Sequence, residues 1–82
     1  MNNHSPELLE TIIVTEDLLE HQVLAGDLGT VVEVYESPEL AYEVEFVNPD
    51  GSTRALLTVR PDQVRTLSAN DVLTTRQISF VA

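Results

Sequence analysis

The stretch from Leu24 to Tyr35 constrains the fold more than any other part of this chain. It contains GDLG at residues 26–29, followed by the valine-rich run TVVEVY at residues 30–35. Two glycines around an aspartate are typical of a tight turn that needs positive φ or a close backbone approach. A run rich in valine is typical of a β-strand. We therefore expect a glycine turn that opens a long strand over residues 28–36.

The segment AYEVEFVN, residues 41–48, is predicted to be the antiparallel partner of that strand. Its apolar and acidic residues alternate, so one face should be buried and the other solvated. We expect Glu43 and Glu45 on the solvated face, and Tyr42 with the core. Alternation along residues 28–36 predicts that Val31, Glu33 and Tyr35 share that outer face.

Three further strands are predicted from β-branched runs and turn residues. Residues 11–15 are β-branched with consecutive apolar positions, which indicates a strand covered on both faces. The turn NPDG at residues 48–51 predicts a hairpin into a strand over residues 52–59, with Ala55 and Leu57 facing inward. A proline turn at residues 60–64, which can form one 3₁₀ turn, leads into a short closing strand over residues 64–67.

Two segments outside these strands carry weaker signals. Residues 16–26 include four aliphatic side chains, so we expect the connection to fold back and cap one open end of a small barrel. A short helix at residues 17–21 is the alternative. Ser5-Pro6-Glu7 is typical of a helix start and predicts at most one helical turn. The apolar residues Leu18, Leu19, Val31 and Val47 are expected to be exposed.

Together these elements predict a mainly β protein, a small five-stranded SH3-like barrel, with an open antiparallel sheet as the alternative. We expect a flexible N-terminus over residues 1–7, the barrel over residues 8–67, and an extended or flexible C-terminal tail over residues 68–82. Residues 74–82 have a strand-like pattern, with Ile78 and Phe80 alternating against Ser79. The tail could be disordered, pair with an edge of its own barrel, or pair with another chain.

The glycine turn and its strand are similar to the KOW-type motif of SH3-like barrels. An ordered series of segments also resembles a family of short bacterial proteins known as domain of unknown function 4926. The series is GDLGTVVEVY, YEVEF, DG, LLT and DQVR, and the similarity covers residues 8–67. The resemblance implies an SH3-like barrel without an established activity. It transfers no catalytic residue, and it does not extend to the tail.

Charge is the strongest feature of the composition. Fourteen acidic residues oppose four arginines, lysine is absent, and the formal net charge is −10. Such a surface repels phosphate backbones and anionic lipids, and it attracts basic partners. It could also serve solubility alone. We therefore expect a basic protein partner and no nucleic acid or membrane partner.

The residues needed for catalysis or metal binding are sparse. Cysteine and lysine are absent, and His4 and His21 fall in a tail and a loop. GDLG lacks the lysine and the helix of a phosphate-binding loop. Carboxylates standing on a flat sheet do not converge as calcium ligands do. We expect no enzyme activity, no cofactor and no metal site.

The residues left as candidates for partner binding lie on the predicted outer face and in the tail: Glu33, Tyr35, Glu43, Glu45, Ile78 and Phe80. We expect a protein–protein interaction module, which could be antitoxin-like or immunity-like. RNA or ribosome association of the KOW type is the alternative, although the arginines of this chain are few and dispersed. Self-association through the tail is possible. The N-terminus lacks a signal-peptide pattern and no apolar run could span a membrane, so we expect a cytoplasmic protein.

Overall fold

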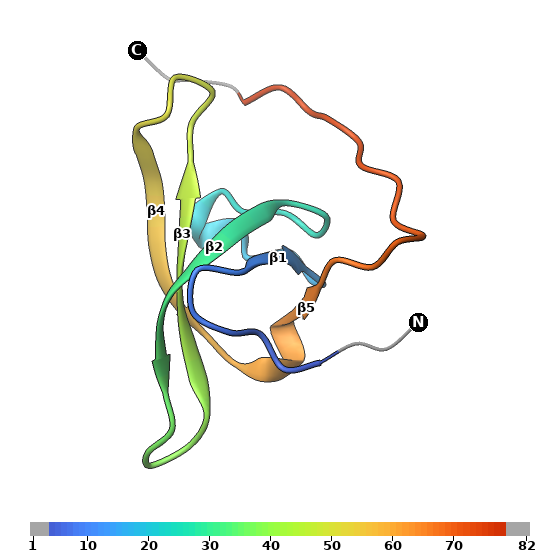
Figure 1. Ribbon diagram of the computed structural model, residues 1–82. Coiled ribbons are helices and arrows are strands. Elements are labelled where there is room, and N and C mark those ends of the chain that lie inside the picture. The colour runs from blue at the N-terminus through green and yellow to red at the C-terminus, as the bar shows by residue number, and fades with distance from the viewer. Residues whose placement is uncertain (1–3, 79–82) are drawn as a thin grey trace.

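The computed structural model describes residues 4–78 (Figure 1). Five antiparallel strands form one open sheet in the order β4-β3-β2-β1-β5, which confirms a mainly β fold. Two single 3₁₀ turns complete the described elements. In chain order the strands and 3₁₀ turns are β1 (Thr11–Val14), η1 (Leu19–His21), β2 (Leu28–Tyr35), β3 (Ala41–Val47), β4 (Thr53–Val59), η2 (Pro61–Gln63) and β5 (Val64–Thr66).

One hydrophobic core lies against the inner face of this twisted sheet. β1 contributes from both of its faces, because Ile12, Ile13 and Val14 are all buried, as the consecutive apolar run predicted. The connection between β1 and β2 folds back through a bridge between Leu18 and Val23. The core consists of Ile12, Val14, Val23, Val31, Tyr42, Val44, Phe46, Val59 and Val64.

The predicted sidedness is correct for β3 and β4. Tyr42, Val44 and Phe46 are buried in β3, and Ala55 and Leu57 of β4 pack against the core while Leu56 is exposed. The hairpin between them turns at Gly51, whose φ is +90°. Its N–H donates to the carbonyl oxygen of Asn48 at 2.8 Å. Clean alternation and turn residues therefore predicted this half of the sheet.

The predicted sidedness of β2 is wrong at its centre. Val31 was expected on the outer face, but it is fully buried. The register with β3 shifts between Val31 and Glu33, so Val32 has no partner there. Such a bulge lets one residue be skipped and reverses which positions face the core. Consequently Val31 faces inward, while Glu33 and Tyr35 still reach the outer face.

Two features outside the strands differ from expectation: the segment before β1 and the position of Leu18 in the connection between β1 and β2. Ser5-Pro6-Glu7 starts no helical turn; the chain makes a turn in which the Glu10 N–H donates to the carbonyl of Glu7, with Leu9 at φ +68°. The Leu9 N–H donates instead to the Val31 carbonyl at 2.6 Å, which holds the segment beside β2. Leu18 was expected to be exposed, yet it packs against the core because its bridge to Val23 turns it inward.

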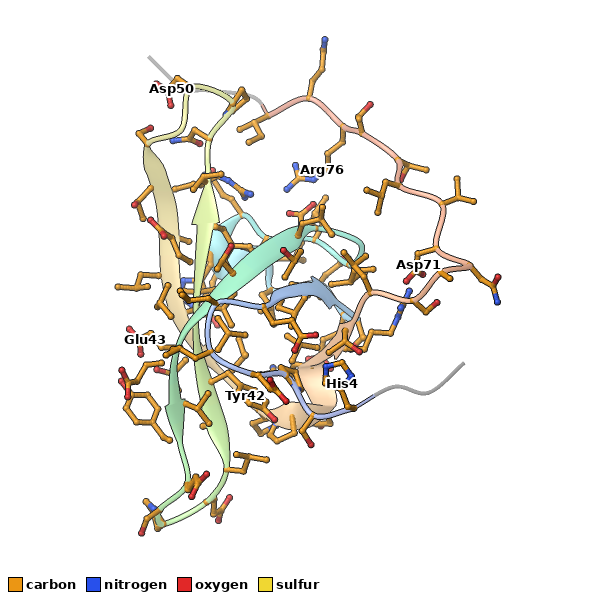
Figure 2. The ribbon with its side chains drawn as sticks, in the orientation of Figure 1. His4, Tyr42, Glu43, Asp50, Asp71 and Arg76 are labelled. Carbon is orange, nitrogen blue, oxygen red and sulfur yellow. The ribbon has the colours of Figure 1, made fainter. Side chains whose placement is uncertain are left out.

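The described part of the tail, residues 68–78, contains no strand. Two ion pairs attach it to the sheet, and Figure 2 labels the tail residues that take part in them, Asp71 and Arg76. Arg65 binds Asp71 at 2.7 Å, and Arg76 binds Asp27 at 2.6 Å. The strand-like pattern predicted for residues 74–82 lies partly outside the described residues.

Candidate functional site

The predicted acidic face lies on the outer side of β2 and β3. Glu33 and Glu43 are direct cross-strand partners, and Glu45 lies two residues further along β3 on the same face. Figure 2 shows Glu43 directed away from the side of the sheet that Tyr42 occupies. The structure therefore brings together three of the predicted partner-binding residues.

Neighbouring hydroxyl groups hold the two glutamates of β3 in place. Glu43 Oε1 accepts hydrogen bonds from the Tyr35 hydroxyl at 3.2 Å and from the Thr58 hydroxyl at 3.1 Å. The hydroxyl of Thr53 donates to Glu45. These donors come from β2 and β4, so the carboxylates are oriented by the strands on both sides. Oriented acceptors lose less conformational freedom when a partner binds them.

Tyr35 lies at the end of the acidic face with 41% of its surface exposed. Its hydrogen bond to Glu43 raises the pKa of the phenol above its usual value, and burial and the charges of Glu43 and Glu33 act in the same direction. The neutral hydroxyl is thus kept as a donor, and the ring offers a flat contact surface. Tyrosine combines large contact area with few rotatable bonds, which suits it to binding surfaces.

The four arginines are all engaged with aspartates. Arg60 binds Asp62 at 3.0 Å and Arg65 binds Asp71, while Arg54 and Arg76 both lie within salt-bridge distance of Asp27. In the part of the chain that the structure describes, no arginine forms an ion pair with a glutamate. The negative charge of the outer face is consequently not neutralised by the protein's own cations.

Sequence reasoning missed two members of this acidic region, Glu36 and Glu39. Both are exposed in the loop that joins β2 to β3. The signal was present in the sequence, because residues 22–53 contain seven acidic residues and no arginine, lysine or histidine. A count of charge along the chain would have marked the whole β2–β3 hairpin.

The tail candidates do not join the acidic pair of Glu33 and Glu43. Ile78 lies beside the turn between β3 and β4, where it shares a hollow of about 540 Å³ with Val47 and Pro49. Phe80 lies outside the described residues. Val47 itself is exposed, as predicted, so the far end of the outer face is apolar rather than acidic.

The two histidines each lie beside an acidic side chain in the described residues. His4 binds Glu10 at 2.7 Å, and His21 lies 3.9 Å from Glu20, so each histidine has a single acidic neighbour. Within residues 4–78, no group of three or more histidine, cysteine or acidic side chains is arranged to hold a metal ion. Over the same residues, no helix has the length and hydrophobicity needed to cross a membrane.

Replacing Glu33 with glutamine is expected to raise the unfolding free energy by about 0.2–1 kcal/mol, because like charges directly opposite each other destabilise a sheet. Urea denaturation at low salt measures this gain. The gain should shrink in 1 M NaCl, where charges are screened within about 3 Å. Glu39→Gln, in the loop, is the matched control and should show a smaller gain; equal gains would contradict the cross-strand explanation.

Comparison with known families places residues 8–66 in one of them. These residues match the family model described as "Domain of unknown function (DUF4926)". The match covers the whole sheet and ends with β5. No curated protein and no solved structure matches the chain.

Proposed function

The chain belongs to the DUF4926 family of unknown function, and we propose that it is a non-catalytic interaction module that binds a basic protein partner through the outer face of β2 and β3. The observation that carries this proposal is the set of glutamates left without arginine partners. Uncompensated charge of one sign accelerates association with a partner of the opposite sign. Tyr35 adds an aromatic contact at the edge of the same face.

The cross-strand pair of Glu33 and Glu43 supports a binding role for this face. Two like charges directly opposite each other reduce sheet stability. Oppositely charged or neutral residues would be more stable at these positions. A positively charged side chain from a partner would relieve the repulsion between Glu33 and Glu43. It would meet a Glu43 carboxylate that is already held in place by hydrogen bonds from Tyr35 and Thr58.

The proposal includes an SH3-like barrel as the finer description of the sheet. Three features support it: the long connection before β2, the two hairpins joining β2, β3 and β4, and the 3₁₀ turn before β5. The strand order supports it as well, because β1 lies between β2 and β5 and so joins the last strand to the rest of the sheet. Small barrels of this kind offer an exposed sheet face and loops for binding, with little interior volume for a catalytic cleft.

A more specific version is an antitoxin-like or immunity-like protein that neutralises a basic toxin. It requires a basic protein encoded beside this one. RNA binding of the KOW type is the less favoured alternative, because each arginine of the described chain is already paired with an aspartate. A gel shift at low salt that shows RNA binding would favour the alternative over the proposal.

The test is an affinity purification of the tagged protein from bacterial cytoplasmic extract at moderate salt, analysed by mass spectrometry. We expect a basic protein to be retained by the wild type and lost with Glu43→Arg/Glu45→Arg. Glu7→Arg/Glu16→Arg is the control, because it changes the net charge equally at exposed sites outside β2 and β3. Circular dichroism verifies that both variants fold. Equal retention by the two variants would refute the proposed face.

A further inference from the structure

β4 is an edge strand, and in the described structure one side of its backbone has no strand beside it. It pairs with β3 alone, and within residues 4–78 no other segment makes a backbone hydrogen bond to residues 54–59. Figure 1 shows it as the outermost strand of the sheet. Edge strands expose unpaired N–H and C=O groups, and natural proteins protect them with lysine, proline or short length. β4 is seven residues long and contains neither lysine nor proline.

The one charged residue of β4 does not protect its edge. Arg54 is turned inward, with a side chain only 11% exposed, and its Nη1 donates to the carbonyl of Gln22 at 2.8 Å. Leu56, in the middle of the strand, is 54% exposed. The edge therefore presents free backbone groups beside an exposed leucine.

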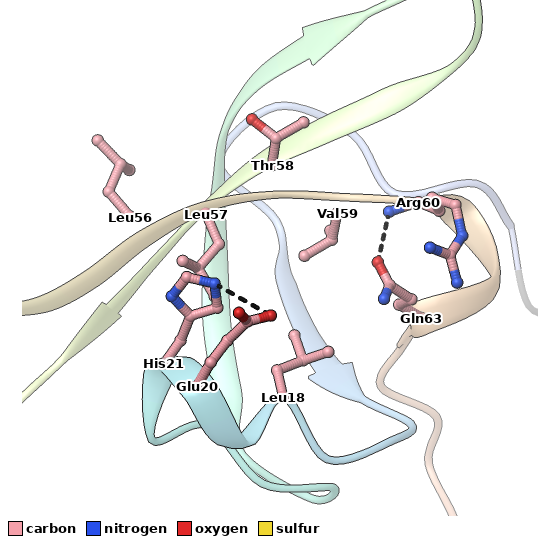
Figure 3. Close-up of a pocket in the computed structure, with 9 residues that line it drawn as sticks. All are labelled: Leu18, Glu20, His21, Leu56, Leu57, Thr58, Val59, Arg60 and Gln63. Carbon is pink, nitrogen blue, oxygen red and sulfur yellow. Dashed lines mark hydrogen bonds and ion pairs between the residues drawn. The ribbon is translucent and has the colours of Figure 1, made fainter.

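A groove runs between β4 and the η1 turn, along the same edge. Two adjoining hollows of about 410 and 480 Å³ share Glu20, His21, Leu56 and Leu57. Figure 3 shows Leu57 and Val59 directed toward η1, whereas Leu56 and Thr58 point to the opposite side. Leu57 and Val59 thus face the groove, whose opposite wall carries polar side chains such as Glu20 and His21. The acidic outer face lies on the other side of β4, where Leu56 is also exposed.

We propose that the basic partner inferred above is received as an added β-strand on the free edge of β4. This inference rests on the proposed function and specifies the partner: an extended segment in which apolar and basic residues alternate. Side chains of an added strand alternate between the two faces of the sheet. Its apolar residues would enter the groove beside Leu57 and Val59, and its basic residues would lie on the outer face.

Charge complementarity supports this occupant. A strand added to β4 lies roughly 10 Å from β3, two inter-strand spacings away. Long lysine or arginine side chains on its outer face can therefore approach Glu43 and Glu45, which pair with Thr58 and Leu56 of β4. Glu20, whose side chain is 85% exposed, lies on the groove side. Pairing with a second copy is opposed by the net charge of −10 on each chain.

The experiment uses the full chain and the peptide Lys-Val-Lys-Leu-Lys-Val-Lys, which matches β4 in length. The control peptide has the same composition with its lysines and its apolar residues in two blocks. We expect the alternating peptide to bind at least tenfold more tightly in calorimetry. It should also slow amide hydrogen exchange within residues 54–59. N-methylation of one alternate set of peptide amides should abolish binding, while methylation of the other set should not.

A pair of matched protein variants locates the site. Leu56→Lys places a positive charge on the β4 edge, where it repels the lysines of the peptide. It should weaken peptide binding at least tenfold. Leu73→Lys makes the same change at a similarly exposed leucine in the tail and should leave binding unchanged. Equal binding of block and alternating peptides would overturn the edge inference but leave the acidic-face proposal intact. Absence of binding by both peptides, or dimerisation of the protein that Leu56→Lys abolishes, would also overturn it.

Discussion

Gly29→Ala is expected to lower the unfolding free energy by about 2–3 kcal/mol, the largest loss we expect from adding a single methyl group to this chain. A Cβ at this position would lie 2.5 Å from Cγ1 of Val44 and 2.8 Å from Cε1 of Phe46. Both neighbours are fully buried core residues that cannot move aside freely. A domain of this size has only a few kcal/mol of stability. Urea denaturation should therefore show that the variant has lost most of its unfolding free energy.

Two controls identify close packing as the cause. Gly51 has φ +90° but no atom near its would-be Cβ, so Gly51→Asn should lower the unfolding free energy by less than about 1 kcal/mol, since asparagine tolerates this conformation. In Gly29→Ala/Val44→Ala the clashing methyl is removed. That double variant should be more stable than the sum of the two single losses. Additive losses would contradict the steric explanation.

The glycine turn shows how far the sequence could predict this fold. GDLG was expected to need positive φ or a close backbone approach, and each glycine serves one of these needs: Gly26 has φ +95°, and Gly29 packs against the core. β3 was predicted correctly because each of its alternate residues is unambiguously apolar or acidic. In such a segment, period-two alternation leaves only one way to bury the apolar side chains.

The errors occur where the residues permit two arrangements. Val31 and Val32 are equally apolar, so nothing in the local pattern indicated that a bulge would turn Val31 inward. At the N-terminus, the Ser-Pro-Glu start signal was overridden by the hydrogen bond from the Leu9 N–H to the carbonyl of Val31. That bond joins segments far apart in sequence, and local propensity cannot anticipate it.

The candidate site was predictable in part for the same reason. Alternation in β3 predicted the shared face of Glu43 and Glu45, and Glu33 reached it despite the bulge. The pairing of arginines with aspartates was not predictable. Arg76 and Asp27 are 49 residues apart, and only the path of the tail brings them together. This pairing determines which acids stay available for a partner.

The ion network around Asp27, which includes Arg54 and Arg76, is also expected to contribute strongly to the stability of the fold. Asp27 accepts two hydrogen bonds from Arg76, at 2.9 and 2.6 Å, and one from the Leu24 N–H at 3.0 Å. Arg54 Nη1 lies 3.8 Å away, and the side chains of Asp27 and Arg54 are only 12% and 11% exposed. The network ties the glycine turn, β4 and the tail together. Removing its only carboxylate would leave Arg54 buried without a counter-ion.

Asp27→Asn is therefore expected to lower the unfolding free energy by about 2–3 kcal/mol at pH 7, the range seen when partly buried charged hydrogen bonds are broken. It should also speed amide exchange in residues 72–78, because Arg76 loses its anchor. Asp62→Asn is the matched control. Its ion pair with Arg60 is exposed, with side chains 65% and 67% accessible, and such pairs contribute little.

The pH dependence of this difference provides a second test. Burial opposes ionisation of Asp27, but the hydrogen bonds from Arg76 and Leu24 and the charges of Arg76 and Arg54 outweigh it, so its pKa lies below the usual value. A carboxyl with a lowered pKa stabilises the fold above its unfolded pKa of about 3.9, and this contribution disappears as pH falls through its folded pKa. The stability gap between wild type and Asp27→Asn should thus be constant from pH 7 to about pH 5 and narrow below about pH 4. A gap that persists unchanged in acid, or an equal loss in Asp62→Asn, would show that the charge of Asp27 does not hold the tail to the sheet.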